Sequence, residues 1–161
     1  MPKGSLKMVF RLPHPIPPKD NSMNATDFIP AHLISDTPPD GSPLPKKGHT
    51  APLLLSKELF NELGIADAQT CGIVIGYGEA MKPTISGKCE LLVDLSDNKL
   101  AEGNIYVLEI GSRALIRRVK LLLRQIILAC DNPNYPDMVV EGEDLSRLKV
   151  IGRVRYIGQR V

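Results

Sequence analysis

The distribution of proline constrains this chain more than any other feature. Eleven of its 14 prolines lie between Pro2 and Pro52. Each proline fixes φ and removes a backbone donor, so a helix or a strand ladder would be interrupted every few residues of that stretch. We therefore expect residues 1–50 to form a linker or an extended arm, and residues 51–161 to form the folded domain.

Two short apolar groups interrupt the arm, and its charge is weak. Met8-Val9-Phe10 is one group, and Phe28-Ile29 with Leu33-Ile34 is the other. Either could dock on the folded domain or on a protein partner, while the rest of the arm has the composition of a mobile linker. The whole formal net charge of +2 resides in residues 1–50, which is too little to indicate nucleic-acid binding.

The remaining sequence predicts a mostly β domain with one short N-terminal helix. Ser56 is a suitable N-cap and Gly64 a suitable stop for a helix over residues 57–63. Apolar runs separated by turn residues then predict short strands, and Gly111-Ser112 between two of them indicates a hairpin. The expected strands cover residues 72–77, 89–95, 104–110, 113–119, 124–130, 138–140 and 148–157.

The cysteines and histidines indicate neither a metal site nor a disulfide framework. Three widely spaced cysteines without a CxxC pair fit neither pattern, and the two inside apolar runs, Cys71 and Cys130, are expected to be buried hydrophobes. The three histidines share no ligand spacing, so we expect no metal and no cofactor. No apolar run approaches the ~18–20 residues of a membrane span, and no signal-peptide pattern opens the chain. We expect a cytoplasmic protein without membrane contact.

Two motifs carry the strongest functional signal in the domain. The first spans residues 78–84, and the second is an apolar run followed by two arginines within residues 114–119. Together they resemble the active-site signature of the LexA and phage-repressor self-cleaving peptidases, the S24 family. That signature has a Gly, a nucleophilic Ser followed by Met, then Pro and Thr, and later a Lys that acts as base. The residues that match the first motif are Gly78, Met81, Pro83 and Thr84.

The resemblance covers roughly residues 51–161 and includes the order of the later elements. Glu102-Gly103 precedes a strand, the loop 131–136 follows the base strand, and residues 150–154 close the series, as in the family. The resemblance therefore implies a LexA- or signal-peptidase-like β-fold made of short strands.

The resemblance also implies a chemistry that this sequence lacks. In the family a Ser–Lys dyad attacks a peptide bond of the chain's own linker. Here Ala80 holds the Ser position and Arg117 the Lys position. A methyl group cannot attack a carbonyl, and a guanidinium, whose pKa is far above neutral, cannot act as a base near neutral pH. The Ala-Gly or Cys-Gly cleavage pair is missing from residues 1–60, and Cys71-Gly72 lies too near Ala80 to loop back.

We expect the side chains of Ala80 and Arg117 to face each other across a shallow groove that holds no active residue. Lys120 is an odd number of positions from Arg117 on a strand, hence on the opposite face. Ser86 lies beyond Pro83 on a different turn. Ala80 is either a natural loss or an engineered Ser-to-Ala change, and natural loss also explains Arg117 and the missing cleavage pair.

Without cleavage, the activity that the resemblance leaves is association. The resemblance implies domains that pair through strands near the C-terminus and assemble further, in repressors of phages and of the SOS response. The candidate pairing strand is residues 150–161, although an ordinary half-exposed strand with protective charges explains it equally well. The candidate residues are Ile151, Arg153, Arg155 and Ile157.

The prolines of residues 1–50 leave no place for a helix-turn-helix unit, which needs several helices. DNA binding is therefore expected only through such a domain outside these 161 residues. The main hypothesis is an inactive, self-associating domain of a phage or prophage repressor that regulates transcription. The alternatives are an engineered nucleophile-dead form of a LexA-like or UmuD-like protein, and a headless antirepressor or polymerase accessory subunit.

Overall fold

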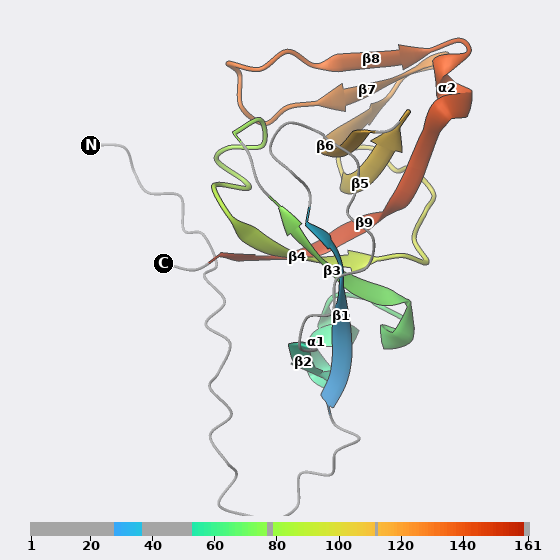
Figure 1. The fold of residues 1–161 in the computed structure, drawn as a ribbon. Coiled ribbons are helices and arrows are strands. Elements are labelled where there is room, and N and C mark those ends of the chain that lie inside the picture. Colours follow the sequence, from blue (N-terminus) through green and yellow to red (C-terminus); the bar gives the residue numbers. More distant parts are fainter. Residues whose placement is uncertain (1–27, 37–52, 77–78, 112, 160–161) are drawn as a thin grey trace, which may run out of the picture.

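The computed structural model describes residues 28–36, 53–76, 79–111 and 113–159. Within them nine strands form one sheet in the order β2-β1-β3-β4-β9-β5-β6-β7-β8 (Figure 1). The expected mostly β fold is thus confirmed, and only β1 with β3 pairs in parallel. The strands are β1 (Phe28–Asp36), β2 (Leu53–Ser56), β3 (Cys71–Gly76), β4 (Cys89–Asp94), β5 (Ile105–Ile110), β6 (Arg113–Leu121), β7 (Gln125–Ala129), β8 (Met138–Glu141) and β9 (Leu148–Gln159).

The predicted helix is present and begins where the sequence indicated. It is α1 (Lys57–Glu62), and the Ser56 Oγ accepts a hydrogen bond from the Leu59 N–H at 3.2 Å. Gly64 follows with a φ of +67°, which glycine adopts without the strain of a side chain. Phe60 is buried beneath α1, where it packs against residues of β3 and β4.

The predicted hairpin is also present. Ile110 at the end of β5 lies opposite Arg113 at the start of β6, and Gly111 between them has a φ of +62°. Two short helical segments were not predicted: a 3-10 helix over Ala68–Thr70, and α2 (Asp144–Arg147) just before β9. None of the helices in the described part of the chain is long and apolar enough to cross a membrane.

One segment of the proline-rich arm belongs to the sheet, although we expected the prolines to block ladder pairing there. Among the described residues, the first half of β1 pairs only with β2, with Pro30 opposite Leu54, and the second half pairs only with β3. Within the described residues, each half of β1 is therefore paired on one side only, which is the kind of strand position where proline is found. Of the two apolar groups for which docking was an alternative, the one within residues 28–34 pairs with the folded domain as part of β1. Met8-Val9-Phe10 lies outside the described residues.

β9 lies inside the sheet and changes partner along its length. It pairs with β5 through residues 148–153 and with β4 through residues 153–159. At the changeover a Cβ on Gly152 would lie 2.4 Å from the Asp94 carbonyl oxygen, so only glycine fits there. Because β5 pairs with β9 only as far as residue 153, the C-terminal half of β9 is paired on one side only within the described residues.

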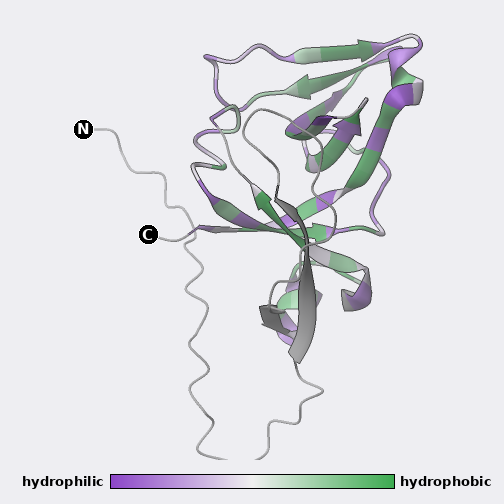
Figure 2. Ribbon diagram, viewed as in Figure 1, coloured by the Kyte–Doolittle hydropathy of each residue, from purple (hydrophilic) through white to green (hydrophobic). Residues whose placement is uncertain are grey.

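The described residues form three buried apolar clusters, one of them the cluster around Phe60 beneath α1. Figure 2 shows apolar stretches along the strands that supply the other two, clusters A and B. Cluster A consists of residues from β3, β4, β5, β6 and the loop before β4. Cluster B consists of residues from β5, β6, β7 and β8. Cluster A contains Val74, Met81, Ile85, Cys89, Leu91, Val93, Ile105, Val107 and Ile116. Cluster B contains Tyr106, Leu108, Val119, Leu128 and Val140.

The cysteines follow the prediction at Cys71 but not at Cys130. Cys71 and Cys89 are buried, Cys130 is only half-buried, and all three are free thiols. Burial raises the pKa of the Cys71 thiol to about 12 and the pKa of the Cys89 thiol to about 11. Cys130 follows β7 at the start of a surface loop, where its Sγ lies 3.3 Å from the Pro136 carbonyl oxygen. Its position after the last strand residue explains its exposure.

Candidate functional site

Apolar side chains anchor the loop that carries the first motif. Met81 and Ile85 are 3% and 2% exposed and belong to cluster A. The Ile85 N–H donates to the Met81 carbonyl at 2.9 Å, which closes a single turn. The Lys82–Pro83 peptide inside this turn is cis. Gly78, the first residue of the motif, lies outside the described residues. Met81 therefore acts in this structure as a core residue.

Asp131 connects this loop to β6. The Thr84 hydroxyl donates to Asp131 Oδ2 at 2.5 Å, and Arg118 donates to both carboxylate oxygens, from Nε at 2.8 Å and from Nη2 at 2.7 Å. Arg118 Nη1 also donates to the Gly103 carbonyl at 2.6 Å. The hydrogen bonds from Arg118 hold the pKa of Asp131 below its usual value; burial opposes this shift, and the Thr84 bond supports it. The carboxylate is thus ionised, and both of its oxygens accept hydrogen bonds.

Asn132 holds the backbone at the predicted nucleophile position. Its N–H donates to the Ala80 carbonyl at 2.9 Å, and its Nδ2 donates to the Glu79 carbonyl at 2.8 Å. The loop after β7 therefore binds both ends of the motif turn, through Asn132 at Ala80 and through Asp131 at Thr84.

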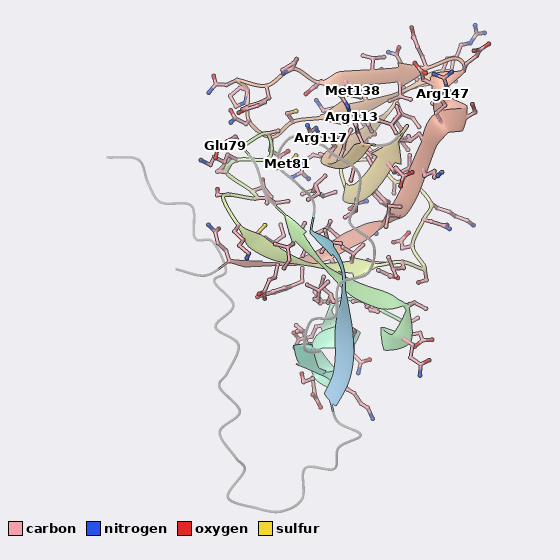
Figure 3. All side chains as sticks on the ribbon, in the orientation of Figure 1. Glu79, Met81, Arg113, Arg117, Met138 and Arg147 are labelled. Carbon is pink, nitrogen blue, oxygen red and sulfur yellow. The ribbon has the colours of Figure 1, made fainter. Side chains whose placement is uncertain are left out.

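Arg117, at the predicted base position, lies on β6 beside this loop. Its side chain is half-buried, and its Nη1 donates to the Ile116 carbonyl at 2.8 Å. Ile116 and Met81 belong to the same cluster A, so β6 and the motif turn contribute to one part of the core. Figure 3 shows Glu79, Met81 and Arg117 in this part of the molecule. That the side chains at positions 80 and 117 face each other stays a prediction.

The two residues considered as substitutes have neighbours of their own. The Lys120 ammonium lies 3.5 Å from an Asp137 carboxylate oxygen, and both side chains are largely exposed. The Ser86 hydroxyl donates to the Pro83 carbonyl at 3.4 Å. Neither contact connects these groups to Ala80.

An open groove of about 450 Å³ runs along the C-terminal half of β9 and reaches the motif loop at Thr84. Neither Ala80 nor Arg117 lines it. Its two arginines, Arg118 and Arg155, are each paired with an aspartate. The polar lining consists of Thr84, Asn104, Arg118, Arg155, Tyr156 and Gln159. The described residues hold no group of three or more His, Cys, Asp or Glu side chains that could bind a metal.

The four candidate pairing residues on β9 all have partners within the same chain. Ile151 and Ile157 pack against cluster A. Arg153 Nη1 lies 3.3 Å from an Asp97 oxygen, and Arg155 Nη2 lies 2.9 Å from the same carboxylate. The Arg155 Nε is buried and has no hydrogen-bond partner among the described residues. These contacts fix the side chains within the domain, and association through them stays a prediction.

Comparison with known proteins identifies the family. The model of the peptidase S24-like family matches residues 47–155, well over half of the chain. The chain therefore belongs to the peptidase S24-like family, which confirms the resemblance seen in the two motifs.

One relative is named as a transcriptional regulator. It is an uncharacterized HTH-type transcriptional regulator of Haemophilus influenzae, 36% identical over 104 residues. These residues are 64% of this chain and 43% of the relative, so the chain spans less than half of the relative's length.

No sequence motif predicted which residues hold the motif turn, namely Arg118, Asp131 and Asn132. The sequence offered one indication of their role: the loop 131–136 stands at the same place in the order of elements as in the family. Nothing in the local sequence indicated that Asp131 would reach Thr84, which is 47 residues away.

Proposed function

We propose that this chain is a cleavage-inactive S24-like domain of a phage or prophage repressor, and that it acts by self-association. The observation that carries the proposal is Ala80 at the nucleophile position. It has no hydroxyl, and its carbonyl is held by Asn132. Arg117 at the base position carries a guanidinium, which cannot replace the amine of lysine as a general base. The motif turn is thus retained as a structural element, joined to the core through Met81.

A role in transcription is supported by the relative that is described as an HTH-type transcriptional regulator. In this proposal, DNA contact belongs to a helix-turn-helix domain outside residues 1–161. The chain's own contribution is to bring two copies together in the cytoplasm, so that two such domains reach neighbouring half-sites.

The edge of β9 supports association. β5 pairs with β9 only as far as Arg153, so residues 154–159 have an open side within the described part of the chain. Backbone donors and acceptors on an open strand pair readily with another strand. A second copy of β9, running antiparallel, satisfies them through a two-fold symmetric contact.

Restoring the nucleophile tests the loss of cleavage. We expect the Ala80→Ser protein, and the Ala80→Ser/Arg117→Lys protein, to stay intact during incubation at alkaline pH, because the linker lacks a cleavage pair. Fragments are measured by mass spectrometry, with urea unfolding to show that each variant is folded. Two fragments from Ala80→Ser would refute the proposal. Fragments from the double variant alone would show that only the dyad had been lost.

Light scattering across concentrations tests association. We expect the full chain to be a dimer or larger at tens of micromolar. A monomer over the whole range would refute association, whatever the outcome of the cleavage test. Binding to arbitrary duplex DNA by this chain alone, with strong salt dependence, would contradict the assignment of DNA contact to another domain.

A further inference from the structure

The edge strand β8 presents an apolar surface that nothing in the described residues covers. Within the described part of the chain, it is the last strand of the sheet order and pairs only with β7. Met138 is 39% exposed and Val139 is 52% exposed, and the nearby loop residue Tyr135 is 43% exposed. Figure 2 shows β8 as an apolar strand at the rim of the molecule. An open, apolar edge of this kind can pair with a further strand.

Charges flank this edge in a defined pattern. Side chains alternate along a strand, so Asp137, Val139 and Glu141 share one face, and Met138 and Val140 share the other. Val140 is 1% exposed and belongs to cluster B, so the Met138 face looks toward the core. The Glu141 carboxylate has no hydrogen-bond or ion-pair partner in the described part of the chain. The Asp137 carboxylate lies 3.5 Å from the Lys120 ammonium.

A second copy of β8 fits this edge poorly. In an antiparallel pair centred on Val139, Asp137 of one copy lies directly opposite Glu141 of the other. Like charges directly opposite each other destabilise a strand pair. The complementary occupant has an apolar centre with a basic residue on each side.

The arm contains such a segment. We propose that residues Lys7-Met8-Val9-Phe10-Arg11 of the same molecule add to the sheet as a strand beside β8. In direct register, Val9 lies beside Val139, the two basic residues lie on the face of Asp137 and Glu141, and Met8 and Phe10 extend the apolar face beside Met138. The segment lies in the proline-free stretch from Lys3 to Leu12, so its backbone can donate along its whole length.

The chain is long enough to make this contact. β8 is seven strand positions from β1 in the sheet order, so a strand added beside β8 lies at the eighth position, a path of roughly 38 Å at ~4.8 Å per strand. The 16 residues from Leu12 to Asp27 can span about 53–58 Å when extended. The charge pattern is the same read in either direction, so both strand orientations place a basic residue opposite each acid.

Nuclear magnetic resonance on the full chain tests the contact. We expect a methyl–methyl NOE between Val9 and Val139. We also expect the β8 amides that do not bond to β7 to exchange about tenfold more slowly than in the Lys7→Glu/Arg11→Glu variant, because that variant places four acids together. The matched control is Lys3→Glu/Lys19→Glu, which changes the net charge equally outside the segment and should leave exchange at β8 unchanged.

Swapping charged residues between the segment and β8 tests the contact a second time and gives the orientation of the added strand. Lys7→Glu with Glu141→Lys should restore slow exchange if the strands are antiparallel, and Arg11→Glu with Glu141→Lys if they are parallel. Restoration by one of the two supports the contact. Restoration by neither, no NOE, or equal exchange in the segment and control variants would overturn it. An NOE seen only between differently labelled molecules would also overturn it, because the segment would then come from another copy.

Discussion

Replacing Asp131 by Asn tests how strongly the motif turn is tied to β6. The substitution keeps the side-chain size but removes the charge that accepts from Arg118 at 2.8 and 2.7 Å and from Thr84. The Arg118 side chain is 32% exposed and the Asp131 side chain 13% exposed, so solvent screens the pair only in part. Hydrogen bonds to charged groups contribute about 1.5–3 kcal/mol, and partial exposure lowers this figure. We expect a loss of about 2 kcal/mol in the free energy of unfolding.

The pH dependence gives the same test a second readout. Because Arg118 lowers the pKa of Asp131 in the folded state, the folded protein takes up this proton less readily than the unfolded chain. The stabilisation is therefore complete above the unfolded-state pKa of ~3.9 and is lost as pH falls through the lower, folded-state pKa. Below about pH 4, the wild-type protein should lose stability more steeply than Asp131→Asn.

Urea unfolding at neutral and acid pH measures both effects. The control is Asp137→Asn, whose carboxylate is 3.5 Å from Lys120 in a pair with side chains 38% and 50% exposed. An asparagine there keeps an oxygen to accept from the Cys130 N–H. An exposed pair contributes about 0–1 kcal/mol, so this variant should lose little. If Asp131→Asn lost no more than Asp137→Asn, the reasoning about the motif turn would be refuted.

Two further predictions concern packing. Gly152→Ala should lower the free energy of unfolding by more than about 2 kcal/mol, because its Cβ would lie 2.4 Å from the Asp94 carbonyl oxygen; an unchanged urea midpoint would contradict the close approach. Burial raises the pKa of Cys71 to about 12 and that of Cys89 to about 11, so a thiol reagent at pH 8 should modify one cysteine, Cys130, in the folded protein and three in urea. Rapid reaction of a second thiol before unfolding would show that the buried sites open.

The local elements followed from the sequence because their causes are local. The α1 helix depends on Ser56 at its start and Gly64 at its end, and both lie within a few residues of the turns that they cap. The hairpin of β5 and β6 depends on a turn at Gly111. The proline-rich arm was misjudged at β1, since a proline excludes ladder pairing only on the side where its N–H is needed.

The sequence by itself determined the family, the mostly β fold and the residue types at positions 80 and 117, because motif spacing and strand alternation can be read along the chain. Only the tertiary structure decided what binds the motif turn. Asp131 and Asn132 reach it from a loop some fifty residues later. β9 takes its place between β4 and β5, with its C-terminal half paired to β4. Such contacts depend on which distant strands become neighbours, and the pairing of distant strands is set by burial of the whole core rather than by any local pattern.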